Sequence, residues 1–359
     1  GLLQHGGNGK LEGTVTVAGQ EVSRTPLWEL AETVGSVFQN PKSQFFNLDT
    51  TSEVLFGLES QGASHQKMEQ ALSSAAHVCG VGSLLDRNIF ALSGGEKQRI
   101  ACASAYAMGP EIFVLDEPSS NLDPEGICQL REVLKQLKAA GKTVLVAEHR
   151  LWYAADLADR VFYLREGRLE RMYPGAEFLA LPDEKRRAMG LRSLTEVPLP
   201  EPKLTPDETE KGLLVRGLRA SYDRMAVWDQ VSFTAPRGVI TAITGHNGAG
   251  KTTLARCLCG LMKEKAGTIL WDGKMLNRKS RRQKSFLIMQ DVNLQLFGES
   301  TLAEAQLGNE ATEVETMAAL ERMDLARYAQ AHPLALSGGQ KQRLAIVDGC
   351  LSGKELLIF

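Results

Sequence analysis

The segment with the clearest chemistry is a glycine-rich stretch, Gly245-His246-Asn247-Gly248-Ala249-Gly250-Lys251-Thr252. It has the pattern G-x-x-x-x-G-K-T, follows an apolar run at Val239–Ile243 and precedes a predicted helix at Thr252–Leu261. Glycines in such a turn let backbone N–H groups surround a polyphosphate, and a helix start adds partial positive charge. Lys251 would then reach the β- and γ-phosphates, and Thr252 would hold Mg²⁺. A glycine turn without a ligand is the alternative, and the flanking strand and helix argue against it.

A pair of carboxylates supplies a second kind of chemistry. Asp116 and Glu117 close an apolar run at Ile112–Leu115, which is predicted to be a buried strand. An acid at such a strand end can hold Mg²⁺ through water, and the next acid can orient or deprotonate an attacking water. Taken alone, the pair would be interpreted as a solvated strand end.

Two nearly identical segments change that interpretation. LSGGEKQR occupies Leu92–Arg99 and LSGGQKQR occupies Leu336–Arg343, 244 residues further on (336 − 92). A match repeated at one long interval indicates a duplicated chain. Ser is a good N-cap and Gly permits close approach of an anion, so both segments are predicted to begin helices that can face a ligand. The residues concerned are Ser93, Gly94 and Gly95 in the first copy, and Ser337, Gly338 and Gly339 in the second.

The elements around these residues repeat as well. The apolar runs 34–40 and 286–291 end in Gln39 and Gln290, and the run Leu356–Phe359 matches Ile112–Leu115. A further predicted strand, Thr143–Ala147, leads into His149. Strands are also predicted near 214–219, 231–235 and 239–243, and a hairpin at 161–172.

Composition narrows the class of protein. The chain has 359 residues, 43% of them apolar and 23% charged, which is typical of globular proteins and enough for two domains. The formal net charge of −2 gives no electrostatic sign of nucleic-acid binding, and no apolar run reaches the roughly 18 residues of a membrane span. The six cysteines lack the paired spacing of zinc sites, so core packing in a reducing compartment is predicted.

These patterns predict two α/β domains joined by a linker. The first domain is predicted at 1–180, a Pro-rich linker at 181–212, and the second domain at 213–359. By the repeat, the first domain has no counterpart of about 213–259, and the second has none of the residues from Asp116 onward. We therefore expect both domains to be truncated in this sequence.

Taken together, LSGGQKQR, LSGGEKQR, GHNGAGKTT and FVLDEPSSNLD resemble the nucleotide-binding domains of ABC ATPases, over nearly the whole chain except the linker. Within that superfamily, VFQNPKSQFF and VLVAEHRLWYAADLADRVFYLREGRLE are similar to the ATPases of energy-coupling-factor transporters, the cobalt and vitamin importers. Two such domains in one chain resemble the fused ATPase subunits of that group. The resemblance implies two tandem P-loop domains, each with a mixed sheet core and a helical subdomain.

The resemblance also implies a role for each matching residue, with ATP and Mg²⁺ as cofactors. Tyr222 would stack on adenine, and the phosphate loop would include Asn247, Gly248, Gly250, Lys251, Thr252 and Thr253. Gln39 and Gln290 would sense the γ-phosphate, contact Mg²⁺ and follow the membrane partner. Asp116 would hold Mg²⁺, Glu117 would be the catalytic base and His149 the switch histidine. Ser120–Asp123 would be the loop between the paired domains.

In this family two domains pair head to tail, with each ATP between the phosphate loop of one and the LSGG segment of the other. The resemblance implies an ATPase subunit at the cytoplasmic face of the membrane that drives import of a small nutrient. Its Gln39 and Gln290 loops would contact an integral membrane component. Because Lys251 would face Ser93 while Asp116, Glu117 and His149 would face Ser337, we expect this chain to lack a complete catalytic site.

Two other classes of protein share part of these patterns. A soluble tandem ABC ATPase acting on ribosomes or nucleic acid shares the LSGGE segment and the duplication, but usually has a long charged linker. A DNA-repair ABC protein would need zinc-binding Cys pairs. The difference between Glu96 and Gln340 leaves open whether the two ATP sites are equivalent.

Overall fold

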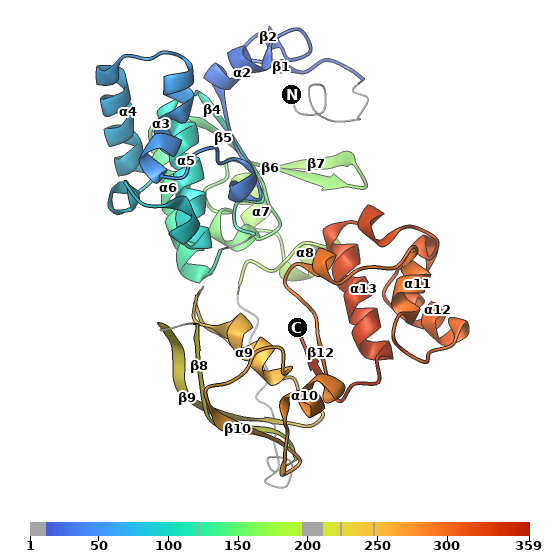
Figure 1. Ribbon diagram of the computed structural model, residues 1–359. Coiled ribbons are helices and arrows are strands. Elements are labelled where there is room, and N and C mark those ends of the chain that lie inside the picture. Colours follow the sequence, from blue (N-terminus) through green and yellow to red (C-terminus); the bar gives the residue numbers. More distant parts are fainter. Residues whose placement is uncertain (1–11, 121, 196–210, 223–224, 247) are drawn as a thin grey trace. The chain divides into compact units, whose positions relative to one another are not determined.

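The computed structural model describes residues 12–120, 122–195, 211–222, 225–246 and 248–359 (Figure 1). The chain divides into two compact units, Gly1–Pro200 and Glu201–Phe359, which we call unit 1 and unit 2. Each is considered by itself.

Unit 1 is organised around a parallel three-stranded sheet. Its strands are β3 (Val34–Val37), β4 (Ile112–Asp116) and β5 (Thr143–Ala147), with β4 in the middle. The predicted strand at Ile112–Leu115 and the predicted strand Thr143–Ala147 are both confirmed. Because all three strands run the same way, the turns after Val37, Asp116 and Ala147 emerge at one edge of the sheet.

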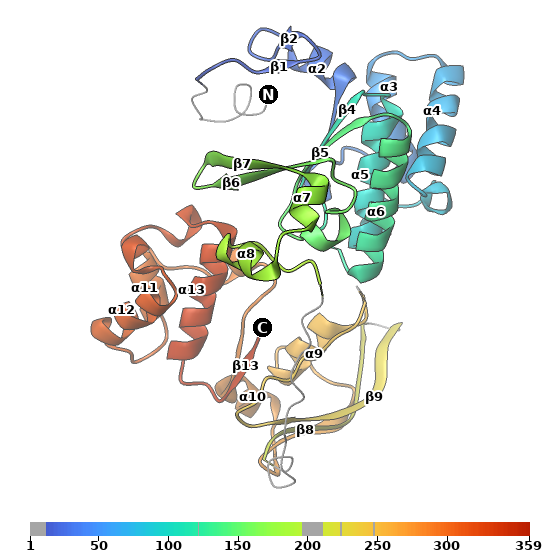
Figure 2. The same ribbon diagram turned by 180° about the vertical axis from the view of Figure 1, so that it is seen from behind.

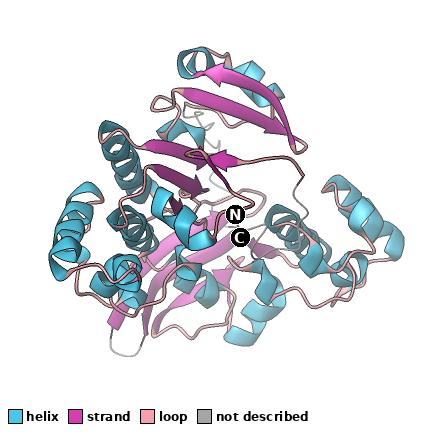
Figure 3. Ribbon diagram, turned by 90° about the horizontal axis from the view of Figure 1, so that it is seen from above, coloured by secondary structure: helices cyan, strands magenta, loops and turns pink. Residues whose placement is uncertain are grey.

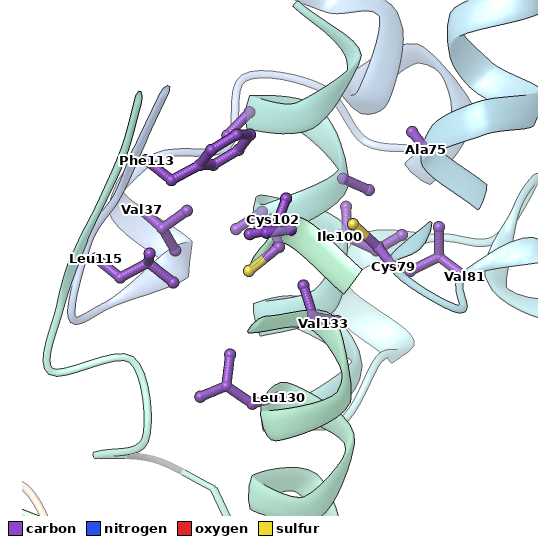
Figure 4. Close-up of a cluster of buried hydrophobic side chains, with 14 of the residues drawn as sticks. Val37, Ala75, Cys79, Val81, Ile100, Cys102, Phe113, Leu115, Leu130 and Val133 are labelled. Carbon is purple, nitrogen blue, oxygen red and sulfur yellow. The ribbon is translucent and has the colours of Figure 1, made fainter. Parts of the chain in front are cut away.

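Four helices of unit 1 complete its main core. They are α3 (Thr50–Ser60), α4 (His65–Val78), α5 (Gly94–Ala107) and α6 (Pro124–Ala139). Figure 4 shows Val37, Phe113 and Leu115 from the strands pointing toward Cys102 on α5. Leu130 and Val133 of α6 join the same cluster (Figure 4), so the sheet and the helices share one apolar interior. Small residues in α5 allow this close packing, because Ala101 and Ala103 are fully buried there.

The remaining elements of unit 1 are short. They comprise β1 (Thr16–Val17), β2 (Gln20–Glu21), α2 (Leu27–Thr33), β6 (Arg160–Arg165), β7 (Arg168–Pro174), α7 (Gly175–Leu179), α8 (Asp183–Ala188) and the 3₁₀ turns η1 (Pro41–Ser43), η2 (Gly82–Leu84), η3 (Ile89–Ala91) and η4 (Leu151–Tyr153). Figure 2 shows the β6–β7 hairpin followed by α7 and α8. The start of the predicted linker is therefore helical, and Leu181 is buried with Tyr173 and Phe178 of unit 1. Residues 196–210 of that linker lie outside the described residues.

Unit 2 contains an antiparallel sheet in the order β11-β10-β8-β9. Its strands are β8 (Gly212–Tyr222), β9 (Met225–Pro236), β10 (Ala266–Trp271) and β11 (Lys274–Met275). The other elements of unit 2 are α9 (Lys251–Leu258), α10 (Arg278–Lys284), β12 (Ser285–Leu287), α11 (Thr301–Gln306), α12 (Glu313–Arg322), α13 (Gly338–Leu351), β13 (Leu356–Ile358) and the 3₁₀ turns η6 (Val292–Leu294), η7 (Ala326–Tyr328) and η8 (Pro333–Ala335). Figure 3 shows that helices and strands both contribute to the chain, which is the mixed α/β class predicted from the sequence.

The duplication is visible in strand pairing. In unit 1, Val34 of β3 pairs with Ile112 of β4. In unit 2, Ser285 of β12 pairs with Leu356 of β13, which are the matching residues of the second copy. Both pairs are parallel, so the repeat preserves register as well as sequence.

One strand prediction is wrong. The apolar run Val239–Ile243 forms no strand, and Ile240 is fully exposed. A short apolar run becomes a strand only when its backbone groups find a ladder partner and its side chains a face to pack on. None of the described strands pairs with these residues. Within the described residues, no helix is both long and apolar enough to cross a bilayer.

Candidate functional site

Three side chains predicted to act together meet at the strand ends of unit 1. Gln39 Nε2 donates a hydrogen bond to Glu117 Oε2 at 2.8 Å, and His149 Nδ1 lies 3.5 Å from the same oxygen. Gln39 follows β3, Glu117 follows β4 and His149 follows β5. The three residues therefore meet because parallel strands deliver their carboxyl ends to one edge. The Glu117 and His149 side chains are 38% and 42% exposed, so a ligand can reach them.

The backbone holds Glu117 in an unusual conformation. Its φ is +40°, in the left-handed region that a residue with a Cβ seldom adopts. Its N–H donates to the Ala147 carbonyl at 2.8 Å, and its own carbonyl accepts from the Ser120 N–H at 3.0 Å. A strained residue fixed from two sides is a common feature of functional sites. Asp116, one residue earlier, ends β4 with an exposed side chain.

A neighbouring carboxylate fixes the histidine segment. Glu148 is buried, and its Oε1 accepts hydrogen bonds from the backbone N–H groups of His149 and Arg150 at 2.8 and 2.9 Å. Its Oε2 accepts from the Tyr153 hydroxyl at 2.9 Å. Burial opposes ionisation of Glu148, but the hydrogen bonds from the Arg150 N–H and the Tyr153 hydroxyl prevail and lower its pKa. Sequence reasoning missed this role, although Glu148 lies directly beside His149.

The first LSGG segment forms the predicted helix start. Ser93 caps α5 through a reciprocal box with Glu96, in which each side chain accepts the other residue's N–H. Gly95 lies against Gly126 of α6, and a Cβ on Gly95 would be 3.5 Å from the Gly126 Cα. Gly94 is the first residue of the helix. The first turn of α5 and the first turn of α6 thus lie backbone against backbone.

The second LSGG segment repeats the cap. Ser337 and Gln340 form the same reciprocal box at the start of α13, with Gln340 in place of Glu96. Added Cβ atoms on Gly338 or Gly339 would meet open space, so these glycines present an accessible backbone. The amide at Gln340 preserves the cap geometry but carries no negative charge.

The glycine-rich loop of unit 2 has a backbone that requires glycine. Gly245, Gly248 and Gly250 all have positive φ, at 154°, 85° and 89°. A Cβ on Gly250 would lie 2.6 Å from side-chain atoms of both Val227 and Trp228, so this position requires glycine. Lys251 and Thr252 begin α9, with the Thr252 side chain exposed.

The lysine and its neighbours define what the loop can hold. Lys251 Nζ donates to the carbonyls of Gly245 and His246 at 2.6 and 2.8 Å, which places its ammonium inside the loop. Glycine backbone, an ammonium, an exposed hydroxyl and a helix start together fit a polyphosphate with Mg²⁺. Thr253 is buried and belongs to the packing of α9. Asn247 and the Tyr222 side chain lie outside the described residues.

The loops that contain the two glutamines have the same construction. Gln290 is exposed, and the nearby Gln295 accepts from the Met289 N–H as Gln44 accepts from the Phe38 N–H. A buried carboxylate ties down each loop further along. Glu53 accepts the N–H groups of Phe46 and Asn47, and Glu304 accepts those of Phe297 and Gly298. Glu53 and Glu304 are separated by 251 residues (304 − 53), the same offset as the two glutamines, so the repeat indicates that they are equivalent. Sequence reasoning did not use this equivalence.

The predicted residues therefore form separate groups. Unit 1 brings Gln39, Asp116, Glu117 and His149 to one sheet edge and holds Ser93 at a helix start. Unit 2 contains the phosphate loop, Gln290 and the helix start at Ser337. The side chains gathered in unit 1 are of the types that can activate water, and the loop in unit 2 is of the type that can bind phosphate.

Comparison with known proteins identifies the class. Residues 5–120 and 228–359 match the ABC transporter family. The chain therefore belongs to the ABC transporter family of ATP-binding proteins, with a mixed α/β fold and two matched segments that fit tandem domains.

Named relatives point the same way. A Treponema denticola protein with the provisional name ABC transporter ATP-binding protein is 43% identical over the whole chain, which spans 75% of that protein. A Methanosarcina acetivorans protein with the same provisional name is 32% identical over 99% of the chain and 68% of its own length.

Two solved structures are also similar. An archaeal ribosome recycling factor, aABCE1, in complex with the stalk protein aP1, has a TM-score of 0.57 over 88% of this chain and 60% of its own at 24% identity, which supports the fold alone. The cbiO1 component of the cbiONQ transporter complex from Clostridium perfringens has a TM-score of 0.44 at 28% identity, over 49% of this chain and 71% of its own.

Proposed function

We propose that this chain is the ATP-hydrolysing part of an importer of the energy-coupling-factor type, which takes up a small nutrient such as a vitamin or a transition-metal ion. The observation that carries the ATPase proposal is the meeting of Gln39, Glu117 and His149 at one sheet edge. In this arrangement the Glu117 carboxylate accepts a proton from water. His149 Nδ1 lies 3.5 Å from Glu117 Oε2, close enough to stabilise the negative charge of that carboxylate. ATP and Mg²⁺ supply the phosphoryl group and the charge neutralisation when bound.

The residues that hold the cofactors follow from the same site. Lys251, the glycine backbone of 245–250 and Thr252 would hold the phosphates and Mg²⁺, and Tyr222 would stack on adenine. The remaining protein contacts to Mg²⁺ would come from Asp116, Gln39 and Gln290. Ser93 and Ser337, each at an accessible helix start, would face the phosphates of the opposite domain in a head-to-tail pair. Such pairing would let ATP hold two surfaces together and its hydrolysis release them.

Two repeated loops support a membrane partner. Phe46 and Phe297 are each 75% exposed, and each belongs to a loop fixed by a buried glutamate, Glu53 or Glu304. An exposed aromatic on a loop tied to a rigid core is suited to bind another protein. Both loops follow the glutamines proposed to sense ATP, so the same segments would transmit motion to an integral membrane component at the cytoplasmic face.

Co-purification tests this proposal. The chain is co-expressed with the products of its neighbouring genes, and the proteins that remain bound in a detergent-solubilised membrane fraction are identified. We expect a small integral membrane protein to co-purify, and its amount to fall at least tenfold with the double change Phe46→Ala and Phe297→Ala, because hot-spot aromatics dominate interface energy. The control is Trp28→Ala with Val314→Ala, which removes apolar side chains that are 72% and 79% exposed elsewhere. Recovery of ribosomes without a membrane protein would instead favour a soluble ATPase acting on ribosomes.

A further inference from the structure

The turn that follows Glu117 is held by a side chain from the neighbouring strand end. Arg150 comes directly after His149, and its Nη1 donates hydrogen bonds to the carbonyls of Ser119 and Leu122 at 3.2 and 3.4 Å. Ser119 and Leu122 are 0% and 7% exposed. Buried carbonyls are costly to leave without a donor. The turn between β4 and α6 therefore depends on a guanidinium supplied from the end of β5.

That turn fixes the backbone of Glu117. A φ of +40° persists only where neighbouring contacts determine it, because residues with a Cβ rarely adopt this region. The Glu117 carbonyl accepts from the Ser120 N–H at 3.0 Å, and the Ser120 hydroxyl donates to the Gln39 carbonyl at 3.4 Å. Both carbonyls bound by Arg150 lie within two residues of Ser120. Removing the guanidinium would loosen the turn on which the Glu117 conformation depends.

The backbone of Arg150 is anchored as well. Its N–H donates to Glu148 Oε1 at 2.9 Å, and the His149 N–H donates to the same oxygen at 2.8 Å. His149 Nδ1 lies 3.5 Å from this oxygen and also 3.5 Å from Glu117 Oε2. Arg150 thus joins the anchored histidine segment, through its backbone, to the turn that follows Glu117, through its side chain.

Another arginine of unit 1 makes the same kind of contact away from the site residues. Arg186, only 6% exposed, donates from Nη1 to the carbonyls of Phe178 and Leu179 at 3.3 and 3.5 Å. These carbonyls lie at the end of α7, a segment that contains none of the residues proposed for catalysis. Arg186 is therefore a matched comparison for Arg150, with the same bonding but a purely structural place.

We propose that Arg150 is a positioning residue for the proposed water activation, and that it holds the Glu117 carboxylate at its distance from His149. The proposal rests on the proposed ATPase function and adds a residue to its machinery. ATP affinity should depend little on Arg150, because Ser119 and Leu122 belong to unit 1 whereas the proposed phosphate loop belongs to unit 2. Lysine at this position keeps a charge and a donor, but it lacks the planar fork of a guanidinium.

Turnover by the assembled ATPase tests the positioning role. Phosphate release is measured against ATP concentration for the unchanged protein, Arg150→Ala, Arg150→Lys and Arg186→Ala. We expect Arg150→Ala to lower kcat at least tenfold with KM for ATP within twofold, and Arg150→Lys to recover part of that loss. Arg186→Ala should keep kcat within twofold, although its urea unfolding midpoint should fall. An Arg150→Ala kcat within twofold of the unchanged value, or an equal fall in Arg186→Ala, would overturn the proposal.

Hydrogen exchange tests the same contact in this chain without ATP or turnover. The Glu117 and Ser120 N–H groups both donate to backbone carbonyls, at 2.8 and 3.0 Å, so their exchange reports the state of the turn. Arg150→Ala should speed exchange at both amides at least tenfold and leave the Val114 amide, in the middle of β4, within twofold. Arg186→Ala should change none of the three. Unaltered exchange at Glu117 and Ser120 in Arg150→Ala would refute the positioning role, whereas absence of turnover in the unchanged protein would refute the proposed ATPase, so the two failures are distinguishable.

Discussion

Gln39 Nε2 donates to Glu117 Oε2 at 2.8 Å, although 78 residues separate the two in the sequence. The glutamine is on an exposed loop after β3, whereas the carboxylate follows the central strand β4. The loop proposed to contact the partner thus touches the proposed catalytic base directly. Movement of that loop would free the Glu117 oxygen that accepts a proton from water.

The role of Glu117 can be separated from nucleotide binding. Glu117→Gln keeps an oxygen for Gln39 Nε2 but removes the group that accepts the proton. In the assembled ATPase we expect turnover to fall about 10²- to 10⁴-fold, with ATP affinity nearly unchanged. Steady-state phosphate release and equilibrium ATP binding measure the two quantities. Turnover equal to that of the unchanged protein would exclude Glu117 as the base.

Lys251 should govern ATP affinity. Lys251→Ala removes the ammonium that now contacts the carbonyls of Gly245 and His246. We expect ATP to bind this chain at least tenfold more weakly, because a charge-assisted contact to phosphate is lost. Fluorescent ATP titration measures the change. Lys265→Ala, at an exposed lysine of the same unit, is the control and should leave affinity within twofold.

The serine caps should contribute to stability apart from any ligand. Ser93→Ala removes the acceptor for the Glu96 N–H, so we expect a loss of about 0.5–2 kcal/mol in the free energy of unfolding. Ser93→Thr retains a hydroxyl and should keep most of the free energy of unfolding that the alanine variant loses. Urea unfolding without nucleotide measures both variants. If alanine and threonine behave alike, the hydroxyl is not needed as a cap.

The buried Glu148 should make the free energy of unfolding depend on pH. Its pKa is lowered in the folded chain, so its contribution is present above the unfolded value near 4.3 and is lost as the pH falls through the folded value. Glu148→Gln should cost about 1–3 kcal/mol at pH 7 and much less near pH 3. Urea unfolding at several pH values measures the difference. A cost independent of pH would show that ionisation of Glu148 is not responsible.

Asp348 should have the opposite pH dependence. Its folded pKa is about 7, above the unfolded value, so the unfolded chain loses this proton first and stability falls between about pH 4 and 7. Asp348→Asn should therefore raise the free energy of unfolding by roughly 2–4 kcal/mol at pH 8 and change little at pH 4. Urea unfolding at both pH values measures this. Destabilisation at pH 8 would contradict a raised pKa.

Much of the local structure could be predicted from the sequence. The runs at 112–115 and 143–147 had the length and apolar content of buried strands, and both are confirmed. Ser93 and Ser337 had the serine and the third-position Glu or Gln of a capping box, which both helices contain. These features are local, so a short window of sequence contains the physics that determines them.

Features that depend on distant partners were not predicted. Val239–Ile243 has the residues of a strand, but no described strand pairs with it. The unpartnered oxygen of Asp348 depends on what surrounds it in three dimensions, and in the sequence it is one acid in a helix of small and apolar residues. Alignment of the two copies at 104 and 348 would have drawn attention to it, since a serine and an aspartate differ there.

The contact between Gly95 and Gly126 has a mechanical consequence. With no side chains between them, the start of α5 and the start of α6 lie backbone against backbone, as the 3.5 Å from a Gly95 Cβ to the Gly126 Cα indicates. Such a joint has almost no compliance, because no rotamer can absorb a displacement. A displacement of the turn at Ser93 is therefore transmitted almost undiminished to the N-terminal end of α6, at Asp123. A methyl group at Gly95 would make only an ordinary contact with the Gly126 Cα, whereas one at Gly126 would crowd the Asp123 carboxylate at 3.2 Å and so disturb the cap of α6.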